Sequence, residues 1–225
     1  MAPRLRGMLA AMAAPGASPC HECDARCCSA YSVHLTLDDT GRIAAGLDLP
    51  LRRFAAHLPQ PAPTATGFLL EPGGRTHDLV LGHRPEGEAE QGCLFLEHGR
   101  CSVYRFRPRA CRRFPAAAEG GRIVAREGTA CGARAWAGCM TRRCWRAELE
   151  RERREVALHE VAVRAWNEKV EGDGGGRRPL AAYLEHLEDA WSVVARLRRA
   201  LRPRDRSGDA FLGRVCEILR CLPRA

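Results

Sequence analysis

The sequence predicts an α+β fold, in which a cysteine-rich part with short strands precedes an all-helical C-terminal region. Up to about residue 125, apolar residues fall in short or alternating runs, which are typical of strands. From residue 141 onward they recur every three or four positions, as in amphipathic helices. Ten of the 12 cysteines precede residue 145. We therefore expect a flexible lead at residues 1–17, a cysteine-cluster domain at 18–140 and a helical region at 141–225.

The strands of the first half are predicted from alternation and from turn residues. Val33, Leu35 and Leu37 alternate and favour a half-buried strand. Pro72-Gly-Gly and His98-Gly99-Arg100 each separate two short apolar runs, so both indicate hairpin turns. The expected strands cover residues 31–37, 68–70, 78–81, 93–96, 101–104 and 122–125.

The helices are predicted from capping residues, prolines and apolar stripes. Asp38 and Asp39 sit where a helix N-cap is needed, and Pro50 should interrupt short helices between residues 43 and 58. Arg107-Pro108 should start a brief helix toward Cys111. The longer helices are expected at residues 141–171, 179–201 and 209–222.

Composition is that of an ordinary globular protein, with 45% hydrophobic and 28% charged residues. No apolar run approaches the ~18 residues of a transmembrane helix, so no membrane association is expected. The alanine-rich N-terminus is a poor secretory signal, which favours a cytoplasmic location. In that setting a large number of cysteines indicates metal binding rather than disulfides.

The net charge of +9 raises the question of nucleic-acid binding. The excess is local, because residues 100–126 contain eight arginines and one glutamate. Few aromatic residues are interleaved with these arginines, and no zinc-finger spacing is present. A zinc-type nucleic-acid-binding module is therefore a disfavoured alternative.

The most specific pattern is Cys20-x2-Cys23-x3-Cys27-Cys28, four thiols within nine residues. Adjacent cysteines rarely form a disulfide with each other, because the ring is strained. Soft thiolates select zinc, copper(I) or iron–sulfur clusters. Because the short strands contain few large apolar residues, bound metal should supply part of the folding energy. The candidate metal ligands are Cys20, Cys23, Cys27, Cys28, Cys93, Cys101, Cys111 and Cys131.

The later motifs extend this pattern. They read Cys93-Leu-Phe-Leu96, Cys101-Ser-Val-Tyr104, Arg107-Pro108 and Cys111-Arg-Arg-Phe-Pro115, and Cys131 follows. In this order the motifs resemble the YkgJ-type cysteine-cluster family, whose domain is described as zinc- or iron-chelating. The resemblance covers roughly residues 18–135 and not the helical region.

The spacing leaves the metal open. Eight thiolates could hold two zinc ions, each bound by four cysteines, or one 4Fe–4S cluster with the remaining thiols structural. The resemblance favours the iron–sulfur cluster slightly. Cys139 and Cys144 could extend the site or be buried thiols, and Cys216 is expected in a helical core.

The resemblance also extends distantly to flagellin lysine N-methylases. It thereby implies an alternative function, an iron–sulfur-dependent enzyme that modifies proteins. Asp24 replaces the glycine that family members often have after the second cysteine, and the helical region lacks a Gly-rich loop for a methyl donor. Whether the protein is an enzyme stays open, and no catalytic residue is assigned. The apolar stripes of the C-terminal helices could also support self-association.

Overall fold

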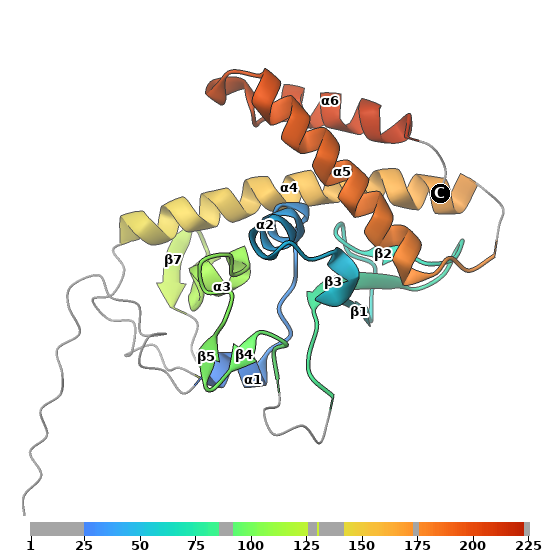
Figure 1. The fold of residues 1–225 in the computed structure, drawn as a ribbon. Coiled ribbons are helices and arrows are strands. Elements are labelled where there is room, and N and C mark those ends of the chain that lie inside the picture. Colours follow the sequence, from blue (N-terminus) through green and yellow to red (C-terminus); the bar gives the residue numbers. More distant parts are fainter. Residues whose placement is uncertain (1–24, 86–91, 126–129, 131–141, 173–175, 223–225) are drawn as a thin grey trace, which may run out of the picture.

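A computed structural model describes residues 25–85, 92–125, 130, 142–172 and 176–222 (Figure 1). Three long helices form one part of the molecule: α4 (Arg142–Gly172), α5 (Leu180–Ala200) and α6 (Asp209–Arg220). The strands, α1 (Arg26–Ala30) and α3 (Arg109–Arg113) lie on the other side of α4 from α6 (Figure 1). The predicted α+β class and the three predicted long helices are confirmed. None of the helices in the described part of the chain carries an apolar stretch that could cross a bilayer.

In the described residues, the strands form three small antiparallel sheets. The largest has the order β1-β3-β2, with β1 at Ala55–Pro59, β2 at Phe68–Leu69 and β3 at Thr76–Leu81. The hairpin predicted around Pro72-Gly-Gly is therefore confirmed. The other two sheets are hairpins, β4 (Leu96–Glu97) with β5 (Arg100–Cys101) and β6 (Ala116–Glu119) with β7 (Arg122–Ala125).

The short helical segments are α1 (Arg26–Ala30), the 3-10 turn η2 (Leu51–Arg53), α3 (Arg109–Arg113), the 3-10 turn η4 (Pro203–Asp205) and the eleven-residue α2 (Leu37–Leu47). The prediction that Asp38 or Asp39 is the N-cap of α2 is wrong. Thr36 is the N-cap, and Asp39 completes a capping box by accepting from the Thr36 amide at 3.1 Å.

The structure corrects two predictions of local structure. The expected strand over residues 31–37 is reduced to an isolated bridge between His34 and Val80, because the helix already begins at Leu37. The expected helix before Pro59 ends as η2, and Ala55–Pro59 instead pairs along β3. Hydrogen bonding to a neighbouring strand outweighs local helix preference at this position.

One hydrophobic core joins the strands to the long helices. Phe68 on β2 stacks on Tyr183 of α5, with ring centroids 3.7 Å apart. The indole of Trp166 donates a hydrogen bond of 2.6 Å to the carbonyl of Leu69. The Asn167 side chain accepts from the Leu69 amide at 2.9 Å and so pairs with the β2 backbone. Helix α4 is thus bonded directly to the edge of the sheet.

Candidate metal centre

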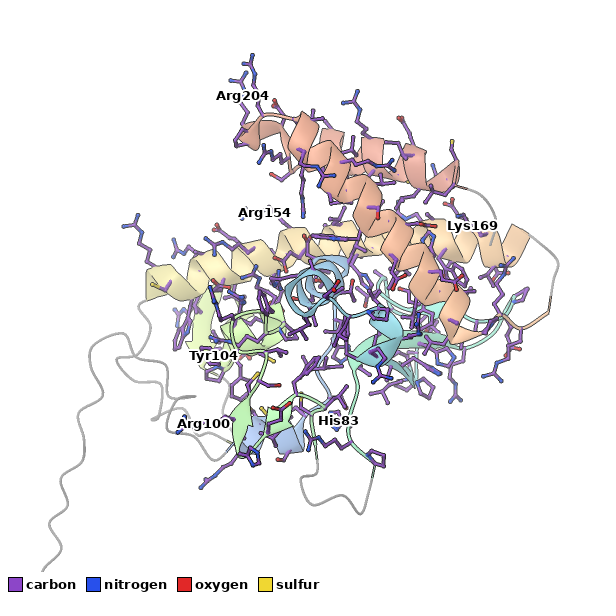
Figure 2. The ribbon with its side chains drawn as sticks, viewed as in Figure 1. His83, Arg100, Tyr104, Arg154, Lys169 and Arg204 are labelled. Carbon is purple, nitrogen blue, oxygen red and sulfur yellow. The ribbon has the colours of Figure 1, made fainter. Side chains whose placement is uncertain are left out.

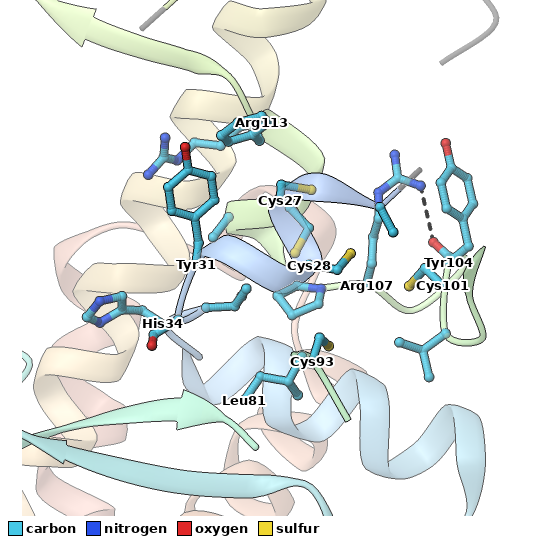
Figure 3. Close-up of a pocket in the computed structure, with 18 of the residues that line it drawn as sticks. Cys27, Cys28, Tyr31, His34, Leu81, Cys93, Cys101, Tyr104, Arg107 and Arg113 are labelled. Carbon is cyan, nitrogen blue, oxygen red and sulfur yellow. Dashed lines mark hydrogen bonds between the residues drawn. The ribbon is translucent and has the colours of Figure 1, made fainter. Parts of the chain in front are cut away.

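Five cysteines from four separate segments line one cavity of about 520 Å³. Figure 3 shows the side chains of Cys27, Cys28, Cys93 and Cys101 arranged around this space. Cys27 and Cys28 come from α1 and Cys101 from β5. The other two are Cys93, next to β4, and Cys111 on α3. Since these residues span 85 positions of the chain, only the tertiary fold brings the thiols together.

A close backbone contact sets the position of Cys93 against Cys28. The Cys93 amide donates to the Cys28 carbonyl at 2.8 Å. The preceding residue, Gly92, has a φ of 110°, and a Cβ there would lie 2.6 Å from the same carbonyl oxygen. Only glycine fits this approach without displacing the backbone. The contact therefore ties α1 to the Cys93 segment.

The β4–β5 hairpin places Cys101 opposite Leu96. His98 and Gly99 have φ values of 50° and 72°, and such positive values at both turn residues are characteristic of the tightest hairpins. The Ser102 amide donates to the Phe95 carbonyl at 2.9 Å and continues the pairing. The turn predicted at residues 98–100 is confirmed, although the strands are shorter than expected.

Two arginines hold the loop between Cys101 and Cys111. Arg112 donates from Nε to the Arg107 carbonyl at 3.1 Å and from a terminal nitrogen to the Arg105 carbonyl at 2.5 Å. Arg107 donates to the Tyr104 carbonyl at 3.2 Å and lies over the Tyr104 ring. Because guanidinium groups bond several carbonyls at once, this loop is fixed without regular secondary structure.

Helix α3, which carries Cys111, is bonded to α2 and α4 through Arg109. Its amide donates to the buried Asp39 carboxylate at 2.8 Å. Its guanidinium, 9% exposed, contacts Glu148 at 2.5 Å and Glu155 at 2.6 Å. Burial raises the pKa of Asp39 to about 6, although the nearby Arg42 guanidinium acts in the opposite direction. We call Arg109, Asp39, Glu148 and Glu155 the Arg109 clamp.

The cysteines influence one another electrostatically. Burial, with smaller contributions from the neighbouring Cys101 and Cys27, raises the pKa of Cys93 to about 11. Burial also raises the pKa of Cys111, and repulsion from Cys27, Cys93 and Cys101 adds to the effect. All four thiols line the same cavity, which agrees with their mutual repulsion. A bound cation would relieve this repulsion, because thiolates are its ligands.

Five of the eight candidate ligands are thus brought to one cavity: Cys27, Cys28, Cys93, Cys101 and Cys111. Cys20, Cys23, Cys131 and the weaker candidate Cys139 lie outside the described residues. Cys144 is exposed on α4, and Cys216 packs against the helical core as expected. Among the described residues, no three His, Cys, Asp or Glu side chains already lie close enough to share one metal ion. The donor set of soft thiols nevertheless fits zinc or iron.

Several supporting residues were not predicted as part of the site. The sequence around Gly92 does not reveal its role, because that role depends on the carbonyl of Cys28, 64 positions away. The role of Arg109 depends on glutamates about 40 residues further along the chain. The brief helix predicted from Arg107-Pro108 toward Cys111 is confirmed as α3, and Arg107 donates to the Tyr104 carbonyl before it.

The comparison with protein families matches residues 19–134 to a family model named CxxCxxCC and described as "Putative zinc- or iron-chelating domain". The matched region contains all eight candidate ligands and more than half of the chain. The chain belongs to the CxxCxxCC family. This agrees with the resemblance to a cysteine-cluster family. No curated protein and no solved structure matches the chain.

The chain departs from the CxxCxxCC spacing by one residue, since three residues separate Cys23 from Cys27. One of these, Ala25, has a left-handed φ of 59° and is the N-cap of α1. Its carbonyl accepts from the Cys28 amide at 2.9 Å. Ala25, which lies within this longer spacing, therefore starts the helix that carries Cys27 and Cys28. The match to the CxxCxxCC family ends before α4, so it does not include the helical region.

Proposed function

We propose that the protein binds an iron–sulfur cluster through the cavity cysteines, with ligands drawn from Cys20, Cys23, Cys27, Cys28, Cys93, Cys101, Cys111 and Cys131. The observation that carries the proposal is the convergence of five thiols from four segments on one cavity. Membership of a zinc- or iron-chelating family supports metal binding in general. The choice of an iron–sulfur cluster rests on the size and the lining of the cavity.

The cavity volume of about 520 Å³ favours a cluster over one zinc ion. A single water-sized particle needs only about 30 Å³, and an ion is of similar size. Apolar side chains also line the space, among them Val33, Leu81 and Val103. Such side chains limit the contact of water with part of the space, and apolar surroundings tune the reduction potential of a bound cluster.

The positive side chains at the cavity suit the charge of such a centre. Arg107 and Arg113 both line it. A cluster bound by four thiolates is anionic, so nearby guanidinium groups lower its free energy. When bound, the cluster would supply one-electron transfer. The residues of this chain would hold it, limit its contact with water and compensate its charge.

Anaerobic purification followed by elemental analysis tests the proposal. We expect iron and acid-labile sulfide in equal amounts, together with the broad visible absorption that makes such proteins brown. A colourless protein with stoichiometric zinc would refute the cluster and leave a zinc site. A protein that retains neither metal, even after anaerobic reconstitution, would refute the metal centre itself.

A further inference from the structure

A second cavity, of about 410 Å³, lies between α4 and the turn that leads from α5 into α6. It shares no lining residue with the cysteine cavity. Figure 1 shows α3, which carries Cys111, and α6 on opposite sides of α4. The family match ends before α4, so most of this second cavity belongs to the unmatched helical region.

Arginines from three elements line this cavity. Arg151, Arg153 and Arg154 come from α4, Arg198 from α5 and Arg206 from the turn before α6. We call these five residues and the space between them the arginine cleft. Figure 2 shows Arg154 on α4, and Arg204, which is not in the cleft lining, at the tip of the turn. Convergence of guanidinium groups from separate elements is the arrangement that binds oxyanions from several sides.

Two of the three carboxylates in the arginine cleft are already neutralised. Asp38 accepts two hydrogen bonds from Arg198, one of them at 3.1 Å. Glu155 accepts from Arg109, outside the cleft, at 2.6 Å. The third, Asp209, lies exposed in the first turn of α6. The carboxylates therefore leave the cleft positive.

Of the remaining arginines, Arg151 pairs with Glu148 at 3.3 Å, and the other three have donors to spare. Arg153 and Arg154 make no hydrogen bond or ion pair with any residue of the described ranges. Arg206 uses only its Nε, which donates to the Leu201 carbonyl at 2.9 Å. Gly208, the N-cap of α6, provides no side-chain cap, so the first amides of the helix add a positive partial charge. These groups provide donors for a ligand with several anionic oxygens.

The bottom of the arginine cleft is apolar. Leu158 and Phe211 line it, and both are at most 4% exposed. The volume lies within the ~300–1,000 Å³ typical of small-molecule sites and exceeds that of one inorganic ion. A ligand that fills this space needs an anionic group for the arginines and an apolar group for Leu158 and Phe211.

We propose that the arginine cleft binds a small organic phosphate, a phosphate ester with an apolar or ring portion. A phosphate suits the site better than a carboxylate, because it offers two negative charges and three oxygens to donors on several sides. The proposal does not rest on the cysteine cavity, so it stands or falls independently of the metal.

Calorimetric titration of the full chain at constant ionic strength tests this proposal. The probes are phenyl phosphate, inorganic phosphate and benzoate. We expect phenyl phosphate to bind at least about tenfold more tightly than either of the others, since only it combines two charges with a ring. Equal affinity for phenyl phosphate and benzoate, or no binding at millimolar phenyl phosphate, would overturn the proposal.

Matched variants locate the binding. Arg154→Gln alone, and together with Arg206→Gln, should weaken phenyl phosphate binding at least about tenfold, because each removes a charged donor. Arg204→Gln removes the same charge from an exposed residue outside the cleft lining and should change affinity less than about twofold. Equal losses in all variants would show non-specific attraction to the basic surface. Metal content should match that of the unchanged protein in every variant.

Discussion

Among the cavity thiols, Cys93 is the most buried, with 6% exposed. We expect Cys93→Ala to lower the iron or zinc bound per chain at least about tenfold, since even indirect partners of a metal ligand have effects of that size. Cys216→Ala is the control, because Cys216 packs against the helical core outside the cavity. Metal analysis of both variants is the measurement. Full metal content in Cys93→Ala would show that Cys93 is not a ligand.

Gly92 allows a second prediction at a single position. An alanine there would place its Cβ 2.6 Å from the Cys28 carbonyl oxygen. Gly73 also has a positive φ, 62°, but a Cβ would have no neighbour within 4 Å. Gly73→Ala should cost about 1 kcal/mol of unfolding free energy for backbone strain alone. Gly92→Ala should cost about 3 kcal/mol, because overpacking adds to that strain.

Urea unfolding of the two glycine variants measures this difference, and metal analysis follows the site. Only Gly92→Ala should also lose metal, since it separates Cys93 from Cys28. Similar unfolding free energies for the two variants would mean that the backbone around Cys28 adjusts freely.

At the scale of elements, the Arg109 clamp fastens the cysteine-bearing α3 to α2 and α4. Arg109→Met would remove the guanidinium that pairs with Glu148 and Glu155, while Asp39 would keep Arg42 and the backbone amide of residue 109. Removing one partner of a buried ion pair costs about 3–5 kcal/mol, so we expect a loss of that size in urea unfolding. Arg151→Met removes the exposed partner of Glu148 and should cost less than about 1 kcal/mol. Equal effects would show that the clamp contributes little.

Elements with a strong periodic pattern could be predicted, whereas those decided by distant contacts could not. The stripe that includes Leu184, Leu187 and Val194 predicted α5 because helical packing repeats along the sequence. Residues 55–59 carry no comparable pattern, and their strand exists because β3 lies beside them. Position 36 was missed as an N-cap because two aspartates follow it and compete for the same role.

The same reasoning applies to the candidate site. Cysteine spacing was enough to predict that Cys27, Cys28, Cys93, Cys101 and Cys111 belong together, and all five line one cavity. Spacing does not predict the residues that hold these thiols in position. The roles of Gly92 and Arg109 depend on contacts with residues that are far away in the sequence. Whether Cys20, Cys23 and Cys131 complete the ligand set stays a prediction.

At the scale of the whole molecule, the shared core contains two buried histidines. Burial lowers the pKa of His159 and of His186 to about 4. Because the unfolded chain takes up these protons near pH 6.5, stability is fully present above that pH and is lost as the pH falls toward 4. Each histidine should cost about 2 kcal/mol at pH 5.

Urea unfolding at pH 7 and pH 5 checks this acid sensitivity. His159→Leu keeps a similar volume in the core and should remove about half of the histidine contribution. Because acid also weakens thiolate–metal bonds, the comparison is made between variant and unchanged protein at the same pH. An identical fall in both would show that His159 does not contribute.

Glu155 faces two ways: its carboxylate accepts from Arg109 at 2.6 Å and also lines the arginine cleft. On α2, Asp38 bonds Arg198 of the cleft while the adjacent Asp39 bonds the Arg109 amide. A ligand that redistributed charge in the arginine cleft would change the free energy of the Arg109 clamp, and the reverse also holds. Thermodynamic linkage makes such an influence mutual and equal in size. The charges of the arginine cleft and of the Arg109 clamp meet on α4 at Glu155 and on α2 at Asp38 and Asp39.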